Sequence, residues 1–313
     1  MKCLVTGVAG FIGSHLAERL LLDGHTVVGI DRFSDYYDPA QKRSNAEGLL
    51  KNSGFELAVR DLASERISDL LDGVDVVFHL AAQAGVRASW GESFSQYVDD
   101  NIRATQRLLE AVKDRSIDKF LYASTSSIYG DAQRFPTPED APPRPVSPYG
   151  VTKLAAEHLC NLYQRNYGVP IVAVRYFTVY GPRQRPDMAF RRFIDALLGG
   201  RDIDIYGDGG QTRDFTYISD AVDATVSAAF SSEAGGVFNV GGGSRIALRD
   251  AISILEELIG AEAQLKFDDA MPGDARDTSA DIARAAAELR YRPSVDLASG
   301  LAKQVSWQRG FRD

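Results

Sequence analysis

The feature that most restricts the fold of this chain is a glycine-rich turn between a short β-prone segment and a helix. Residues 2–6 (Lys-Cys-Leu-Val-Thr) favour a strand, Gly7, Gly10 and Gly13 follow, and residues 14–22 have an amphipathic helical pattern. Glycines at such spacing permit a tight turn, close approach of the backbone to a phosphate, and close packing of helix on strand. The segment therefore predicts a βαβ unit with an anion site at the helix N-terminus.

A second strand, predicted at residues 26–30, is followed directly by Asp31. A carboxylate roughly 20 residues beyond such a turn binds the ribose hydroxyls of a dinucleotide and disfavours an extra phosphate there. The pattern therefore favours NAD over NADP. Two alternatives stay open: Arg32 could pair with the phosphate of NADP, and the turn could be a plain βαβ connection without a nucleotide.

Strands and helices alternate through the first half of the chain. Further strands are predicted at 55–59, 74–80, 119–123 and 171–176, with helices at 64–71, 94–113 and 149–166. This order predicts an α/β fold, a Rossmann-type doubly wound parallel sheet that binds ligands at the carboxyl ends of its strands. Beyond Thr178 the pattern loosens, and we expect a strand at 236–240 and a helix at 248–259.

We expect two interwoven domains. An NAD-binding Rossmann domain would comprise residues 1–176 plus about 215–242. A smaller C-terminal substrate-binding lobe would comprise residues 177–214 and 243–313.

Charge and hydrophobic content restrict the class of protein. The net charge of −8 argues against nucleic acid or an anionic membrane as a partner. No apolar run reaches the ~20 residues of a membrane span, and no signal-peptide pattern is visible. The only cysteines, Cys3 and Cys160, favour a cytoplasmic protein without a disulfide. The four histidines lack metal-ligand spacing, so no metal site is expected.

A possible general base lies at the start of the helix predicted at 149–166. Ser147 is a good N-cap and Pro148 a favoured first residue, so Tyr149 and Lys153 fall one turn apart on one face. A free tyrosine has a pKa of about 10, and a nearby cation in a dry site can lower it toward 7. The spacing alone favours a surface tyrosine beside a solvated lysine, but the dinucleotide turn upstream reverses that preference and favours the catalytic interpretation.

Four motifs in order resemble the extended short-chain dehydrogenase/reductases, which include sugar-nucleotide epimerases, dehydratases and decarboxylases. They are Gly7-x-x-Gly10-x-x-Gly13, His79-Leu80-Ala81-Ala82-Gln83, Ser124-Thr125-Ser126-Ser127-Ile128-Tyr129-Gly130 and Tyr149-x-x-x-Lys153. The resemblance runs nearly end to end and implies Tyr149, Lys153 and Thr125 as catalytic residues. The NAD-binding residues that it implies are Gly7, Gly10, Phe11, Ile12, Gly13, Asp31, Arg32, Asp61, Leu62, Leu80, Ala81, Ala82, Gln83, Asn101, Ser124, Tyr149, Lys153 and Tyr176.

Two serines separate the chemistries of this family. Dehydratases carry an Asp-Glu pair where this chain has Ser126 and Ser127, and the decarboxylases usually have Glu at the position of Ser127. Serine cannot act as a carboxylate base, so the resemblance disfavours both reactions and favours an epimerase.

Residues 35–39, 82–87 and 177–189 are similar to those of UDP-glucuronate 4-epimerases. This similarity implies conversion of UDP-glucuronate to UDP-galacturonate by oxidation at carbon 4, rotation of the 4-keto sugar and hydride return. A hexuronate needs hydroxyls and a cation around its carboxylate. The implied substrate-binding residues are Arg87, Thr125, Ser126, Ser127, Tyr149, Thr178, Arg185, Met188, Tyr206, Arg213 and Arg276.

Other functions remain open at this point. The first alternative is a 4-epimerase of UDP-glucose or UDP-N-acetylglucosamine, which would use the same catalytic residues. A UDP-glucuronate decarboxylase ranks second, and a non-catalytic NAD-binding regulatory module ranks third. The resemblance also implies a homodimer formed through the helices at 94–113 and 149–166.

Overall fold

The computed structural model describes residues 1–231 and 235–311 and is built around a seven-stranded sheet. The strand order is β11-β6-β5-β4-β1-β2-β3, and every neighbouring pair is parallel. The strands are β1 (Lys2–Thr6), β2 (Thr26–Asp31), β3 (Phe55–Val59), β4 (Val76–His79), β5 (Lys119–Thr125), β6 (Ile171–Tyr176) and β11 (Gly236–Val240). The predicted Rossmann-type parallel sheet is confirmed.

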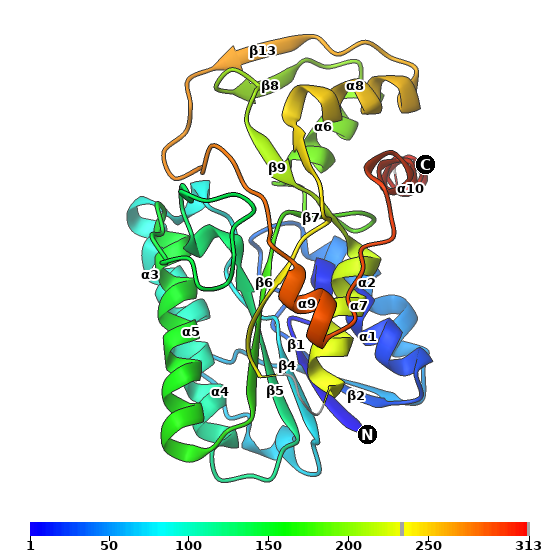
Figure 1. The fold of residues 1–313 in the computed structure, drawn as a ribbon. Coiled ribbons are helices and arrows are strands. Elements are labelled where there is room, and N and C mark those ends of the chain that lie inside the picture. Colours follow the sequence, from blue (N-terminus) through cyan, green and yellow to red (C-terminus); the bar gives the residue numbers. More distant parts are fainter. Residues whose placement is uncertain (232–234, 312–313) are drawn as a thin grey trace.

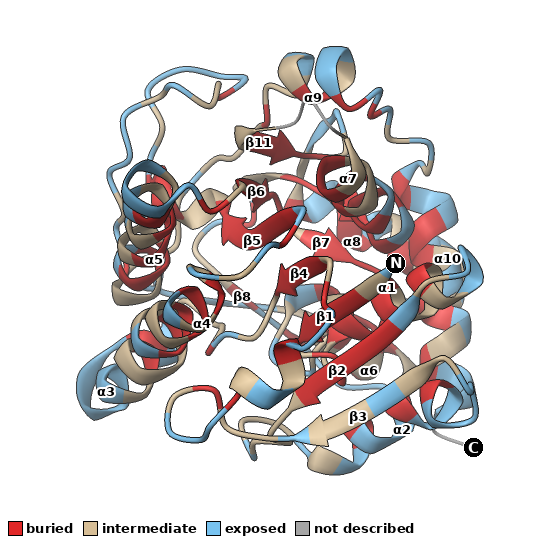
Figure 2. Ribbon diagram, turned by 90° about the horizontal axis from the view of Figure 1, so that it is seen from below, coloured by how far each residue is buried: buried red, intermediate tan, exposed pale blue. Residues whose placement is uncertain are grey.

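Helices cover both faces of this sheet (Figure 2). One face packs against α1 (Phe11–Leu22) and α7 (Ile218–Phe230), and the other against α4 (Ala104–Val112) and α5 (Pro148–Tyr167). In β1, Cys3 and Val5 enter the first core and Leu4 the second, because successive side chains of a strand point to opposite faces. Burial on both faces explains why these strands read as continuous apolar runs.

Smaller sheets lie beyond the carboxyl ends of the main strands (Figure 1). They pair β7 (Val179–Tyr180) with β10 (Thr216–Tyr217), β8 (Ile203–Tyr206) with β13 (Leu265–Asp268), and β9 (Thr212–Asp214) with β12 (Arg245–Ala247). Helices α6 (Ala189–Leu198), α8 (Leu248–Ile259) and α10 (Leu297–Gly310) pack there. Between these elements the chain returns to the main sheet through α7 and β11.

Several predicted helices differ from the structure. Residues 64–71 form a turn and one 3-10 turn (Ser68–Leu71), because the Asp61 carboxylate caps the amide of Ala63 and the segment is too short to continue. The single helix expected at 94–113 consists of α3 (Phe94–Tyr97), a π-helical stretch (Val98–Arg103) and α4. Helices α2 (Pro39–Leu50), α6, α7, α9 (Ala283–Glu288) and α10 lacked a sequence prediction.

Element boundaries shifted by a few residues elsewhere. Helix α1 begins at Phe11 rather than at residue 14, β4 spans Val76–His79 within the predicted 74–80, and β5 extends to Thr125. Among the described residues, none of the helices combines the length and apolar character that crossing a bilayer requires.

The glycine turn provides a test of packing. A Cβ at Gly13 would lie 2.1 Å from the carbonyl oxygen of Gly7, so backbone must move to accept it. We expect Gly13→Ala to reduce the free energy of unfolding by about 3 kcal/mol or more. Gly48 lies inside α2 with no atom closer than 4.0 Å to such a Cβ. Gly48→Ala should therefore raise stability by about 0.5–1 kcal/mol. Urea unfolding of both variants checks the contrast, and equal effects would contradict it.

Candidate active site

A cavity of about 770 Å³ lies at the carboxyl ends of the main strands and is lined by residues from the main sheet and from the smaller sheets. Most of the residues predicted for the site line it. They are Gly7, Gly10, Phe11, Ile12, Gly13, Asp31, Arg32, Asp61, Leu62, Leu80, Ala81, Ala82, Gln83, Arg87, Ser124, Thr125, Ser126, Ser127, Tyr149, Lys153, Tyr176, Thr178, Arg185, Met188 and Tyr206. The structure thus brings together residues from both halves of the chain.

The glycine turn forms one end of the cavity. Gly7 has a φ of +70°, and a Cβ there would lie 2.9 Å from the backbone nitrogen of Ala81, so only glycine fits without strain. Helix α1 follows with Gly10 as its N-cap, no side chain of the described residues caps it, and its first turn holds no acidic residue. The amide groups at this helix end are therefore available to an anion.

The carboxylate at the end of β2 is fixed by backbone donors. Asp31 accepts hydrogen bonds from the amides of Ala9 (3.1 Å) and Phe33 (2.8 Å), which hold it at the cavity wall. The neighbouring Arg32 guanidinium donates to both oxygens of Asp100 (2.8 and 2.6 Å) and to Asp61 (3.3 Å). Two carboxylates therefore neutralise Arg32, and the alternative in which it pairs with an NADP phosphate loses its support.

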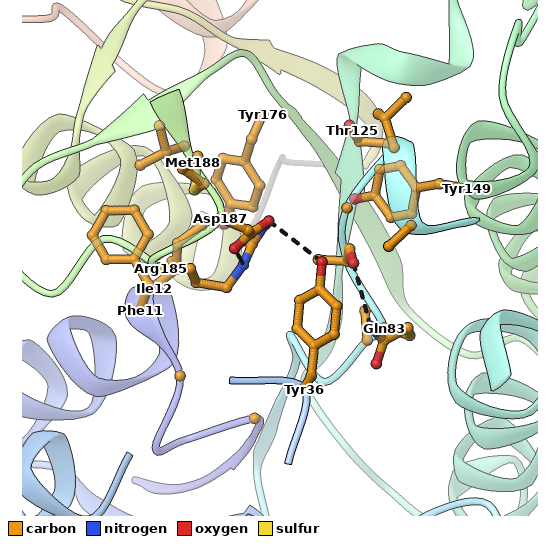
Figure 3. Close-up of a pocket in the computed structure, with 18 of the residues that line it drawn as sticks. Phe11, Ile12, Tyr36, Gln83, Thr125, Tyr149, Tyr176, Arg185, Asp187 and Met188 are labelled. Atoms are coloured by element: carbon orange, nitrogen blue, oxygen red, sulfur yellow. Dashed lines mark hydrogen bonds and ion pairs between the residues drawn. The ribbon is translucent and has the colours of Figure 1, made fainter. Parts of the chain in front are cut away.

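Tyr149, Thr125 and Lys153 all line the cavity. The Ser147 hydroxyl caps α5 by accepting a hydrogen bond from the amide of Gly150 (3.1 Å), which places Tyr149 in the first helical turn. Thr125 is the last residue of β5, and Figure 3 shows it beside Tyr149. The Lys153 ammonium lies 4.3 Å from the centre of the Tyr122 ring.

The electrostatics of this centre differ from the sequence expectation. Burial raises the pKa of Tyr149, and the Arg185 charge and a hydrogen bond with Thr125 oppose that effect. Burial also lowers the pKa of Lys153 to about 7, because a low-dielectric site disfavours the ammonium form. Among the charged groups that act on the Tyr149 phenol in this structure, Arg185 lowers its pKa and Asp187 raises it.

A buried ion pair behind the site was missed by the sequence analysis. Glu157 of α5 accepts hydrogen bonds from Ser124 at the end of β5 (2.7 Å) and from Arg175 of β6 (3.2 Å). Both charged side chains are at most 6% exposed. These contacts fix α5, and with it Tyr149 and Lys153, against two strands of the sheet. The sequence did contain a signal for this ion pair, namely the charged residue Arg175 inside the otherwise apolar run of residues 171–176.

Asn101 supports the site from outside the cavity. Its amide exchanges two hydrogen bonds with the backbone of Gln83 (2.8 and 3.0 Å) and donates one to Thr152 of α5 (2.9 Å). It therefore joins the loop after β4 to the helix of Tyr149, and it does not line the pocket.

The opposite wall carries an arginine from the loop between β7 and α6. Figure 3 shows Arg185, Asp187 and Met188 across the cavity from Tyr149 and Thr125. Arg185 donates to Asp187 through Nε (3.0 Å) and Nη2 (2.9 Å). The cavity therefore places a phenol, several hydroxyls and a guanidinium around one space.

The remaining predicted arginines differ in whether they line the cavity. Arg87 lines the cavity, pairs with Asp274 (2.8 Å) and lies over the Tyr206 ring (4.1 Å). Arg213 donates to the backbone carbonyls of Thr212 and Arg276, and neither Arg213 nor Arg276 lines the cavity. Arg276 is exposed and pairs with Asp208. The structure thus does not bring these two into the site.

Comparison with known proteins agrees with this geometry. Residues 3–241 match the model of the NAD dependent epimerase/dehydratase family. An uncharacterized UDP-glucose epimerase of Bacillus subtilis (strain 168) is 46% identical over 309 residues, covering 98% of each chain. A UDP-glucuronate 4-epimerase of Thermodesulfobacterium geofontis (strain OPF15) is 42% identical over 311 residues, covering 98% of this chain and 95% of that protein.

A solved structure has the same overall fold. The crystal structure of UDP-glucuronic acid 4-epimerase from Bacillus cereus, in complex with UDP-glucuronic acid and NAD, matches with a TM-score of 0.97 and 47% identity. The match covers 99% of this chain and 100% of that one.

Proposed function

This chain belongs to the NAD dependent epimerase/dehydratase family, and on that premise we propose that it is an NAD-dependent UDP-sugar 4-epimerase that interconverts UDP-glucuronate and UDP-galacturonate. The proposal is supported by relatives over nearly the whole chain that carry this name, and by a solved relative that holds UDP-glucuronic acid and NAD. The sequence prediction reached the same function from its motifs.

The observation that carries the proposal is that Arg185 and Tyr149 face each other across one cavity (Figure 3). The charge of Arg185 lowers the pKa of the Tyr149 phenol, although burial keeps that pKa raised. In a hexuronate the carbon 4 hydroxyl and the carbon 5 carboxylate are on neighbouring ring atoms. A site that oxidises carbon 4 of such a sugar needs a base and a cation that face the same cavity.

The residues at the other end of the cavity fit NAD. The uncapped start of α1 suits a pyrophosphate, the fixed Asp31 carboxylate suits ribose hydroxyls, and the neutralised Arg32 offers no site for an extra phosphate. We assign to cofactor binding the predicted residues that line the cavity, with Asn101 as their support through Gln83. When bound, NAD would supply a reversible hydride acceptor for carbon 4.

Residues of the chain would transfer the proton of the 4-hydroxyl. In its tyrosinate form, Tyr149 would take the proton of the 4-hydroxyl as hydride leaves carbon 4, and would return it after the sugar has turned over. Thr125 contacts Tyr149 and can bond the reacting oxygen. Lys153, whose pKa lies at about 7, can hold or release a proton near neutral pH.

The carboxylate needs restraint during this cycle. A 4-keto hexuronate is a β-keto acid, which loses carbon dioxide when its carboxyl carbon–carbon bond aligns with the ketone. Arg185 and the hydroxyls of Thr178, Ser126 and Ser127 line the cavity and can fix the carboxylate in another orientation. No carboxylate base stands at residues 126 and 127, which agrees with an epimerase.

Proton NMR of the purified protein with UDP-glucuronate tests the proposal. We expect UDP-galacturonate to form without added reductant and without net consumption of NAD, because the hydride returns to the sugar. Formation of UDP-xylose would indicate a decarboxylase, and turnover of UDP-glucose alone would indicate a different sugar.

A UDP-glucose 4-epimerase is the second candidate. It is favoured by the name of the Bacillus subtilis relative, a UDP-glucose epimerase, and by the pairing of Arg185 with Asp187, which gives that ion pair no net charge. The ratio of kcat/KM for UDP-glucuronate to that for UDP-glucose separates the two. We expect the uronate to be preferred.

We also propose the finer features of organisation. Residues 177–214 and 243–313 would bind the sugar nucleotide in a cytoplasmic homodimer. Exposed apolar side chains on α3 and α5, namely Phe94, Val151, Leu162 and Tyr167, support a dimer face there. Light scattering after size exclusion measures the mass, and Leu162→Glu should shift a dimer to monomer.

The lowered pKa of Lys153 predicts a pH-dependent stability of the nucleotide-free protein. The unfolded chain keeps the ordinary lysine pKa of 10.5 and so binds more protons than the folded chain from about pH 7 upward. The Lys153 contribution to the free energy of unfolding therefore rises with pH, by up to about 1.4 kcal/mol per unit. Urea unfolding at pH 7, 8 and 9 should show the stability advantage of Lys153→Met shrinking with pH. A constant difference contradicts the shift.

A further inference from the structure

The guanidinium of Arg185 already holds a carboxylate of its own chain. Asp187 accepts from Nε and Nη2, which is the bidentate pairing of a guanidinium with a carboxylate. The Arg185 side chain is 21% exposed and that of Asp187 35%, so the pair lies at the cavity wall rather than in open solvent. Tyr36 adds a longer hydrogen bond to Asp187 (3.4 Å).

This pairing uses only part of the guanidinium. Among residues 1–231 and 235–311, Nη1 of Arg185 has no hydrogen-bond acceptor, whereas Nε and Nη2 both have one. A guanidinium can bind two carboxylates at once through two of its edges. Both Arg185 and Asp187 line the cavity that contains Tyr149. A substrate carboxylate on the free edge would therefore face Asp187 across Arg185.

We propose that Asp187 is a built-in counter-ion that weakens the grip of Arg185 on the substrate carboxylate and so allows the sugar to turn over. The inference rests on the proposed function. Asp187 does not take part in the proton transfer. Its carboxylate partly neutralises the positive charge of Arg185 that attracts the carboxylate of a bound uronate. It thereby tunes both affinity for the uronate and the rate of rotation.

The physical reason lies in what happens when the carboxylate leaves. Inversion at carbon 4 requires the keto sugar to turn its other face to the hydride donor, so the carboxylate must separate from Arg185. An arginine left unpaired in a half-buried site is costly, because its charge has lost both water and partner. With Asp187 in place the guanidinium stays paired throughout, so rotation costs less. The same negative charge repels the bound uronate and limits its affinity.

The test compares Asp187→Asn with the parent protein in the NAD-bound form. Binding is measured by calorimetry in a Tyr149→Phe background, so that the sugar is not converted during the titration. We expect Asp187→Asn to bind UDP-glucuronate roughly tenfold more tightly, while its affinity for the neutral UDP-glucose changes less than about twofold. With Tyr149 intact, KM for UDP-glucuronate and kcat should both fall.

Two further variants serve as controls. Asp187→Glu keeps the charge and should retain the parent affinity for the uronate. Asp202→Asn removes the same charge at an exposed pair with Lys266 and should change neither affinity. Unchanged or weaker uronate binding by Asp187→Asn overturns the inference, as does equal tightening of UDP-glucose. Failure of the wild-type protein to convert UDP-glucuronate would instead overturn the proposed function, since that measurement does not involve Asp187.

Discussion

Tyr149→Phe is expected to lower the rate of UDP-galacturonate formation by roughly 10³-fold, the range typical of a lost general base. The substitution removes one oxygen atom and leaves the aromatic ring, whose edge-to-face packing on Tyr97 (6.3 Å between centres) can persist. The loss should therefore appear in kcat with little change in the affinity for the substrate. Initial rates by proton NMR and calorimetric binding together measure both.

A matched variant isolates the hydroxyl. Tyr163 lies on the same helix, and its hydroxyl bonds Gln106 and Glu110 away from the cavity. Tyr163→Phe should keep the parent rate. A Tyr149→Phe protein that epimerises as fast as the parent would falsify the assignment of this phenol as the base, whatever its effect on binding.

Most strands of the main sheet were predictable because a buried parallel strand appears in the sequence as a short run of consecutive apolar residues. The predicted bounds of β1, β3, β6 and β11 match the structure. Strands β1, β6 and β11 are short, mostly buried runs in a sheet that is covered on both faces, whereas the edge strand β3 has no buried residue. The helix predicted at 64–71 failed because a side-chain cap and a short length favoured a turn, and pattern alone does not register such competition. The π-helical stretch from Val98 to Arg103 interrupts a pattern that looked continuous.

The parts of the candidate site that were predictable are those whose residues lie close together in the sequence. The glycine turn, Asp31 and the Tyr149–Lys153 pair each occupy one segment, and the structure brings all of them to one cavity. The charge partners were not predictable, because they come from distant loops. Asp100 is 68 residues from Arg32, and Asp274 is 187 residues from Arg87. Because those partners could not be predicted, the sequence analysis treated both arginines as unpaired cations.

The same limit explains the pKa of Tyr149. Helical spacing placed a lysine near the phenol but carried no information on burial, which raises the pKa of Tyr149 and lowers that of Lys153. It also carried no information on Arg185, which the fold brings from another segment to the same cavity. Local spacing therefore indicated the two candidate groups, whereas their burial and the nearby charges of Arg185 and Asp187 are evident only in the tertiary structure.

Arg185→Ala is expected to change the products as well as the rate. Loss of a partner in a desolvated carboxylate–guanidinium pair should lower kcat/KM for UDP-glucuronate on the order of 10²-fold. The 4-keto intermediate would then orient its carboxylate freely, so a larger share of turnovers should release carbon dioxide and a 4-keto pentose. Carbon dioxide from labelled carbon 6 and proton NMR of the sugar measure this partition. Unchanged partitioning removes Arg185 from the role of restraint.

Two companions separate charge from geometry in that result. Arg185→Lys keeps a positive charge but cannot make two parallel hydrogen bonds, so it should recover part of the affinity while still releasing carbon dioxide. Arg185→Ala also leaves Asp187 unpaired in the cavity wall, where it repels the uronate. Adding Asp187→Asn to Arg185→Ala should therefore restore some affinity for UDP-glucuronate without restoring the restraint on decarboxylation. If the double variant recovered both, repulsion by Asp187 rather than loss of the guanidinium would explain the decarboxylation.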